Sequence, residues 1–185
     1  MNPTISAAIT ALRQGGVIAY PTEFCYGLGC NPRDQQAVEQ ILQIKQRDVS
    51  QGLILIAANL KQVVEYAVLD GLPNLTAIKD SWPGPNTWVL PAQTDTPAWI
   101  RGKHPSVALR VTNHPMVVEL CNGFGGAIVS TSANRHGQDA LKSFAEVFAE
   151  MGGEIDQVLD GELSHSGKDQ AASNIFDGRT GKQLR

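Results

Sequence analysis

The chain has few of the residues that mark secreted, membrane or metal-binding proteins. Only three of its 185 residues are cysteine, an odd number without framework spacing, so we expect reduced thiols. Its four histidines form no i, i+4 pair and lie near no cysteine pair, so we expect no metal held by the protein itself. No apolar run approaches the roughly 20 residues that span a bilayer, and the first residues lack signal-peptide character. We therefore expect a cytoplasmic protein without membrane contact.

The charge balance is also modest. Fifteen Lys and Arg against 18 Asp and Glu give a net charge of -3, whereas domains that bind nucleic-acid backbones are usually strongly basic. A local basic cleft remains compatible with this balance. With 42% hydrophobic and 18% charged residues, the composition excludes a disordered, collagen-like or coiled-coil chain. Without repeats or linkers, a chain of this length predicts one domain over residues 1–185.

Apolar periodicity predicts alternating helices and strands. Stripes with i, i+3, i+4 spacing predict helices at 5–12, 38–42, 60–67, 116–120 and 144–151. Short apolar runs predict strands at 17–20, 53–56, 87–90, 107–111 and 127–129, with short late strands at 158–159 and 174–176. Asp34 is a candidate helix cap, and Ser143 with Glu146 is a candidate capping box. The alternation favours an α/β fold, and its mixed connection lengths favour a mixed sheet.

Three charged residues interrupt the apolar pattern. Lys45 continues the stripe of the 38–42 helix, where an ammonium group needs an anion or water, and Arg47 follows it. Both also suit a simple charged helix end. Arg110 lies within the 107–111 strand, where it is either solvated or, if both sheet faces are covered, paired with a carboxylate or phosphate.

Two strand ends carry small polar residues. The strand at 127–129 runs directly into Ser130-Thr131-Ser132-Ala133-Asn134. Strand ends of this kind bind ligands in α/β folds, although an Asn-stabilised loop explains the same residues. Pro21-Thr22-Glu23 follows the first strand in the same way, and Glu23 is either a base or a turn organiser. The segment contains no Gly-x-Ser-x-Gly nucleophile elbow.

Six ordered motifs carry a family resemblance. They are Tyr20-Pro21-Thr22-Glu23, Tyr26-Gly27-Leu28-Gly29, Lys45-Gln46-Arg47, Trp82-Pro83-Gly84-Pro85-Asn86-Thr87, Ser106 to Arg110, and Ser130 to Asn134, and the match continues through Ser173 to Asp177 and to Leu184-Arg185. Together they resemble the YrdC/TsaC family of threonylcarbamoyl-AMP synthases, in its short form. Each motif is modest alone, but the ordered set is specific.

The resemblance implies a single-domain, twisted mixed β-sheet flanked by helices, with a deep, positively charged cleft. It also implies a nucleotidyltransferase that condenses L-threonine, bicarbonate and ATP to threonylcarbamoyl-AMP and pyrophosphate. In the family, a separate transferase complex uses this product to modify adenosine at position 37 of tRNAs that read codons beginning with A. Such chemistry needs cations and N–H donors but no covalent protein nucleophile.

The resemblance also implies the roles of individual residues. Lys45 and Arg47 would be catalytic, on the ATP phosphates, with Ser106, Ser132, Asn134 and Arg185 completing the ATP site. Thr22, Arg110, Ser130 and Ser173 would hold threonine, Arg110 through its carboxylate. Mg²⁺ would arrive with ATP, held by phosphates and waters rather than by a dedicated protein site. The chain departs from the family pattern at Phe24-Cys25, Asp48 and His136.

Two other functions fit parts of the pattern. An RNA-binding or ribosome-maturation module would use the same basic cleft for a phosphate backbone, with weak contact to tRNA or double-stranded RNA, although the acidic net charge argues against this. A carbamoyl-transfer domain for metallocentre assembly normally sits in a longer chain with cysteine clusters. Dependence on threonine separates the synthase from both alternatives.

Overall fold

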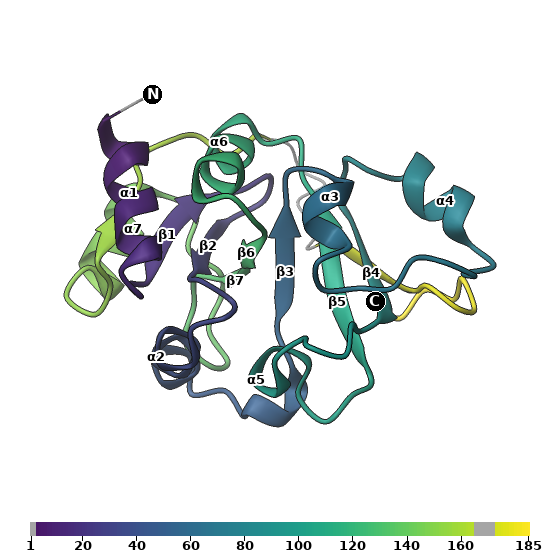
Figure 1. Cartoon of the computed structure of the whole chain (residues 1–185). Helices are drawn as coiled ribbons and strands as arrows, with labels where there is room; N and C mark the ends of the chain where they lie inside the picture. The colour runs from purple at the N-terminus through teal and green to yellow at the C-terminus, as the bar shows by residue number, and fades with distance from the viewer. Residues whose placement is uncertain (1–2, 165–172) are drawn as a thin grey trace.

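The computed structural model describes residues 3–164 and 173–185; His165, one of the four histidines considered as metal ligands, lies outside them. The helices are α1 (Pro3–Arg13), α2 (Gln35–Lys45), α3 (Leu60–Val63), α4 (Leu75–Asp80), α5 (Ala98–Arg101), α6 (Pro115–Phe124) and α7 (Phe144–Met151), with a 3-10 turn η1 (Val49–Gln51). The strands are β1 (Ile18–Pro21), β2 (Tyr26–Gly29), β3 (Ile54–Ala57), β4 (Asn86–Pro91), β5 (Ser106–Val111), β6 (Ile128–Val129), β7 (Thr131–Ser132), β8 (Gln157–Val158) and β9 (Asn174–Asp177). Figure 1 shows their arrangement.

The strands form two mixed sheets, which confirms the α/β prediction but corrects the expected single sheet. One sheet has the order β7-β2-β1-β8 and the other β6-β3-β5-β4-β9. Each contains parallel and antiparallel pairs, such as β1 with β8 and β1 with β2 in the first sheet. The sheets separate because the chain leaves β6 in one sheet, passes through Ser130, and enters β7 in the other. Ser130 therefore marks the junction between the sheets.

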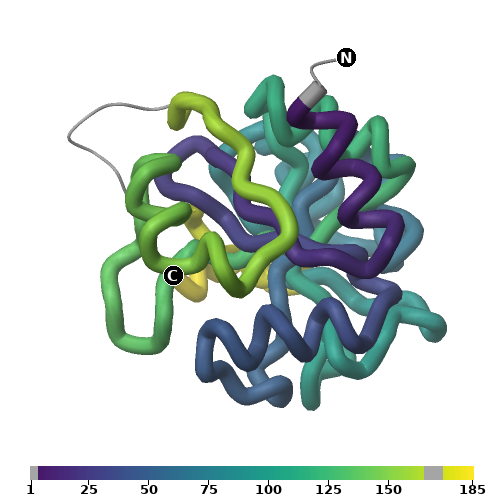
Figure 2. The backbone as a smooth tube through the Cα atoms, turned by 90° about the vertical axis from the view of Figure 1, so that its left-hand side faces the viewer, coloured from purple at the N-terminus to yellow at the C-terminus, as the bar shows by residue number. Residues whose placement is uncertain are grey.

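Two hydrophobic clusters hold helices against the sheets. Successive strand residues alternate between them: Ile56 packs with α1 and α6, whereas Leu55 and Ala57 pack into the larger cluster with α2. The period-2 alternation of strand side chains produces this division. Helices α1 and α6 lie side by side on the outside of the molecule (Figures 1 and 2). The sheets are therefore covered on both faces, the condition under which Arg110 was expected to need a partner.

Most predicted elements are present, and their caps form as expected. The Asp34 carboxylate accepts from the Ala37 N–H at the start of α2, and Ser143 with Glu146 forms a capping box on α7. The helix predicted at 60–67 is wrong in extent, since α3 ends at Val63. Val64 is exposed, and Ala67 instead forms a bridge to Ala92 beside β4. The apolar spacing at 60–67 therefore spans two different structures, the single helical turn of α3 and a following segment in which Ala67 pairs with Ala92.

The way α2 ends sends Lys45 and Arg47 in different directions. Gln46 adopts a left-handed conformation with φ of 50°, its N–H bonds to the Gln43 carbonyl, and the Arg47 N–H bonds to the Leu42 carbonyl. This turn ends the helix. Lys45 consequently remains on the buried face of α2, while Arg47 leaves the helix axis and is only partly buried.

A close approach of backbones joins α5 to η1. Gly102 has φ of 63°, and a Cβ atom there would lie 2.7 Å from the backbone nitrogen of Gly52. The Leu53 N–H also donates to the Ile100 carbonyl over 2.8 Å. Only glycine fits this position without moving a neighbouring backbone.

Gly102→Ala is accordingly expected to lower the free energy of unfolding by about 2 kcal/mol, through left-handed strain and backbone overlap. Chemical denaturation measures this change. Gly153→Ala is the matched control, because a Cβ at Gly153 meets nothing within 4 Å. Equal stabilities of the two variants would contradict the close approach.

Candidate active site

A cavity of about 490 Å³ opens where the two sheets meet. Its wall comes from the turn between β1 and β2, from η1, from β4 and β5, from the Ser130–Ser132 crossing, and from the C-terminal segment. Eight of the ten predicted site residues line it: Thr22, Arg47, Ser106, Arg110, Ser130, Ser132, Ser173 and Arg185. The fold therefore brings together polar residues that are far apart in the sequence.

Lys45 and Asn134 form a layer directly behind this wall. The Lys45 ammonium donates to the Ser132 carbonyl over 2.6 Å and to the Asn134 side-chain oxygen over 2.7 Å. It also donates to the Asn134 carbonyl over 3.1 Å. The Ser132 hydroxyl donates to the same Asn134 side-chain oxygen over 2.7 Å. Lys45 is thus bound to the end of β7 and to the segment that follows it, and it fixes the position of the Ser132 wall residue.

Burial makes this ammonium easier to deprotonate. It lowers the pKa of Lys45 to about 8, and the positive charge of Arg47 contributes to the same shift. Below this value the ammonium keeps its three hydrogen bonds, and above it the charge and at least one bond are lost.

The activity of the site should therefore fall as pH rises through about 8. Folding stability should not fall with it, because the unfolded chain binds more protons there than the folded one, and this group's contribution to stability rises with pH. Lys45→Arg stays charged across this range, so the variant's residual activity should lack the alkaline fall. A pH-rate profile beside melting curves measures both effects. An unchanged alkaline fall in the arginine variant would assign it to another group.

Arg47 places a guanidinium group in the cavity wall. One of its terminal nitrogens donates to the Gly52 carbonyl over 3.0 Å, while its Nε is buried without a hydrogen-bond partner among the described residues. Partial burial lowers the pKa of Arg47. The Asp48 carboxylate accepts from the Ser50 N–H over 2.6 Å and caps η1, the turn that leads to Gly52. Asp48 therefore shapes the loop that holds Arg47.

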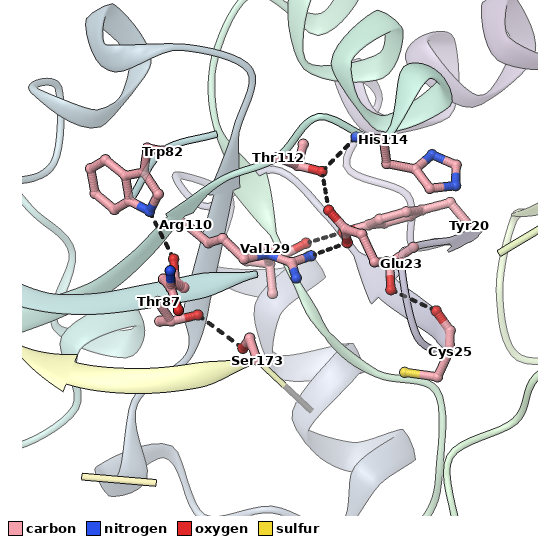
Figure 3. Close-up of polar contacts among 12 residues, drawn as sticks. Tyr20, Glu23, Cys25, Trp82, Thr87, Arg110, Thr112, His114, Val129 and Ser173 are labelled. Carbon is pink, nitrogen blue, oxygen red and sulfur yellow. Dashed lines mark hydrogen bonds and ion pairs between the residues drawn. The ribbon is translucent and has the colours of Figure 1, made fainter. Parts of the chain in front are cut away.

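Arg110 reaches the cavity from β5 as half of a buried ion pair (Figure 3). Its terminal nitrogen lies 2.8 Å from Glu23 Oε2, and the two side chains are 8% and 1% exposed. The Thr112 hydroxyl donates to Glu23 Oε1 over 2.6 Å. Of the two possibilities for Arg110, solvation or pairing with an anion, the structure shows pairing with a carboxylate, that of Glu23. Glu23 is not among the cavity-lining residues, so its environment suits a counter-ion rather than a base.

Known proteins match this chain over nearly its whole length. The family model Sua5_yciO_yrdC, described as "Telomere recombination", matches residues 10–184. The chain belongs to the Sua5/YciO/YrdC family. A threonylcarbamoyl-AMP synthase of Cellvibrio japonicus is 46% identical and covers 100% of this chain and 96% of its own length. One from Pseudoalteromonas translucida is 48% identical, with coverages of 98% and 97%.

Solved structures of this family share the fold. P. abyssi Sua5 complexed with L-threonine has a TM-score of 0.84 and 32% identity, covering 94% of this chain. The present chain spans 50% of that longer protein. E. coli YciO has a TM-score of 0.83 at 24% identity, with coverages of 97% of this chain and 89% of its own.

Two further family motifs close the cavity. The Thr22 hydroxyl donates to the Cys25 carbonyl over 2.7 Å, which fixes the turn after β1. The Ser173 hydroxyl lies 3.0 Å from the Thr87 hydroxyl, and Arg185 donates to the Ser173 carbonyl over 3.1 Å. The predicted residues at the C-terminal end of the family pattern therefore lie in the wall.

Sequence reasoning missed two basic members of the wall, Arg101 and His104. Arg101 ends α5, a helix that the periodicity did not predict, and its side chain donates to the His104 carbonyl over 3.1 Å. The basic cluster Arg101-Gly102-Lys103-His104 was the available signal. Within the described part of the chain, the cavity lining holds four arginines, Arg47, Arg101, Arg110 and Arg185, and no Asp or Glu.

The described ranges hold neither a metal-ligand cluster nor a membrane-spanning helix. Across residues 3–164 and 173–185, no group of three or more His, Cys, Asp or Glu side chains is placed to hold a metal ion. Within the same ranges, no helix combines the length and apolar character that crossing a bilayer requires.

Proposed function

We propose that this chain is a threonylcarbamoyl-AMP synthase, which condenses L-threonine, bicarbonate and ATP to threonylcarbamoyl-AMP and pyrophosphate. The observation that supports this best is a cavity of about 490 Å³ whose described lining holds four arginines and no Asp or Glu side chain. Such a cavity suits substrates that are anions at neutral pH, as ATP and bicarbonate are. Full-length relatives at 43–49% identity bear this enzyme name, which supports the proposal over an RNA-binding module.

Threonine would bind at the Arg110 end of the cavity. A guanidinium group holds a carboxylate through two parallel hydrogen bonds, and the pairing with Glu23 leaves further N–H donors on Arg110. The hydroxyls of Thr22, Ser130 and Ser173 line the same cavity and would bind the polar groups of the amino acid. P. abyssi Sua5, which shares the fold, has been solved with L-threonine bound.

ATP would bind with its phosphates at the Arg47 end. The guanidinium group of Arg47 lines this end of the cavity, and Arg185, Ser106 and Ser132 contribute further donors to the wall. Lys45 and Asn134 would act on the nucleotide through the wall segment that they hold in place. The four arginines that line the cavity support the positively charged cleft that the resemblance implies.

The reaction follows from what this arrangement supplies. Bicarbonate and the threonine amine condense to a carbamate with loss of water. A carbamate oxygen then attacks the α-phosphorus, a new O–P bond forms, and the bond to the pyrophosphate oxygen breaks. Charge grows on the leaving pyrophosphate, so fixed cations and N–H donors accelerate the step by electrostatic stabilisation and positioning. The protein needs to supply no covalent nucleophile.

We propose that Mg²⁺ enters this site together with ATP. A dedicated protein site would need several oxygen ligands from the chain, and the described cavity lining contains no Asp or Glu side chain. Bound to the phosphates and waters, the ion would offset charge on the triphosphate. The described residues would then act on the phosphates directly.

A second enzyme has to use the threonylcarbamoyl-AMP that this reaction forms. Threonylcarbamoyl-AMP is a reactive mixed anhydride, so we propose that a separate transferase complex receives it and modifies tRNA. A weak contact with tRNA or double-stranded RNA would use the basic residues Arg101, Lys103 and His104 beside the cavity. Its affinity should fall steeply with salt.

Pyrophosphate release tests the synthase proposal. Purified protein with ATP and Mg²⁺ should release pyrophosphate only when L-threonine and bicarbonate are both present, and glycine should replace threonine poorly. Protein that binds RNA with a steep salt dependence but releases no pyrophosphate would overturn the enzyme and restore the RNA-binding alternative.

A further inference from the structure

We propose that Glu23 is a positioning residue, which holds the Arg110 guanidinium in the orientation that binds the threonine carboxylate. The inference rests on the proposed function and adds a role that motif comparison did not assign. It depends on a cluster of four residues behind the cavity wall: Glu23, Arg110, Thr112 and His114.

The turn after β1 gives its two polar side chains different tasks. Thr22 lines the cavity and its hydroxyl donates to the Cys25 carbonyl, which tightens the turn. Glu23, the next residue, is 1% exposed and contacts the Arg110 guanidinium (Figure 3). The same turn thus supplies one group to the cavity and one to the residue beneath it.

The carboxylate itself is fixed by a second partner. The Thr112 hydroxyl donates to Glu23 Oε1, and the same hydroxyl oxygen accepts from the His114 N–H over 3.0 Å. The His114 ring is anchored in turn, with Nε2 3.1 Å from the Glu162 carbonyl oxygen. The hydrogen bond to Oε1 therefore limits rotation of the carboxylate, and Oε2 faces Arg110 as an ion-pair contact at 2.8 Å without an aligned hydrogen bond. Such a chain of contacts holds a guanidinium plane in one orientation.

Orientation matters because Arg110 has to share its donors. A guanidinium group carries five N–H donors in a fixed fork, so the edge that faces Glu23 decides which edge faces the cavity. Arg110 lines the cavity while it contacts Glu23, which shows that both directions are used at once. A preformed fork lowers the entropy lost when threonine binds.

A neutral side chain at position 23 should therefore impair threonine more than ATP. Glu23→Gln keeps the size but removes the charge that orients Arg110. We expect its KM for threonine to rise about tenfold or more, with a change of less than about twofold in the KM for ATP. Glu23→Asp keeps the charge and should recover part of the threonine affinity.

Two further variants keep the test decisive. Thr112→Val removes the hydroxyl that fixes Glu23 but leaves the ion pair, so it should shift threonine affinity in the same direction by a smaller factor, and it serves if Glu23→Gln fails to fold. Glu65→Gln is the matched control, because Glu65 is exposed and outside the cavity lining. It should leave both KM values unchanged.

The outcomes separate the inference from the function on which it rests. An active wild type with the threonine-specific defect supports both. An active wild type whose Glu23→Gln variant loses threonine and ATP affinity equally, or neither, overturns the positioning role and leaves the synthase intact. A wild type that shows no threonine-dependent turnover overturns the proposed function, and the positioning role falls with it.

Discussion

Lys45→Ala should lower threonine-dependent pyrophosphate release by at least about a hundredfold, the loss typical when a preorganised polar group leaves an active site. The variant removes the donor to three oxygens of the segment from Ser132 to Asn134. Two carbonyls and an amide oxygen then lie half-buried with fewer partners, and the wall that positions the nucleotide loosens. The KM for ATP should therefore rise more than the KM for threonine.

The control is Lys61→Ala, which removes an exposed lysine from α3. It should leave both KM values and the turnover number within about twofold of the wild type. Steady-state kinetics with each substrate varied separately distinguishes the outcomes. A Lys45→Ala variant with normal ATP affinity would contradict the assignment of Lys45 to the nucleotide side.

Arg110→Gln should lower the free energy of unfolding more than Gly102→Ala does, and it should also abolish threonine binding. Its removal leaves the Glu23 carboxylate buried at 1% exposure without its cation. Breaking a buried pair in this way destabilises proteins by about 3–5 kcal/mol. For a chain of this length, that corresponds to a fall in melting temperature of roughly 10 °C. Differential scanning calorimetry measures the fall.

The double variant Glu23→Gln with Arg110→Gln gives the decisive comparison. With both charges gone, most of the lost stability should return, because no uncompensated charge remains buried. Threonine binding should not return, since the guanidinium that holds the carboxylate is absent. A double variant as unstable as Arg110→Gln alone would contradict the ion-pair account.

Local chemistry made much of the site predictable from sequence. Lys45 continues an apolar helical stripe, and an ammonium on the packed face of a helix must find acceptors. The structure confirms the burial and supplies the acceptors, the carbonyls of Ser132 and Asn134. For Arg110, the sequence left open whether the guanidinium is solvated or paired. Both faces of the sheet are covered, and the guanidinium pairs with Glu23. In both cases, the sequence raised the question of a partner but left a solvated or helix-end role open.

The identity of each partner depended on tertiary structure. Glu23 and Arg110 are 87 positions apart in the printed sequence and meet only because the turn after β1 faces the end of β5. The division into two sheets was also unpredictable, since a single residue, Ser130, separates β6 from β7. Strand pairing is set by non-local contacts that periodicity does not contain. Arg101 was missed for the same reason, because the short helix α5 is stabilised by contacts rather than by a long apolar stripe.

The most direct test of the account follows the carbon of bicarbonate. The protein is incubated with ¹⁴C-bicarbonate, α-³²P-ATP and L-threonine, and the nucleotides are separated. We expect one product that carries both labels, appears only with threonine, and is lost in Arg110→Gln and Lys45→Ala. Pyrophosphate release without any doubly labelled nucleotide, or a doubly labelled nucleotide that forms without threonine, would contradict it.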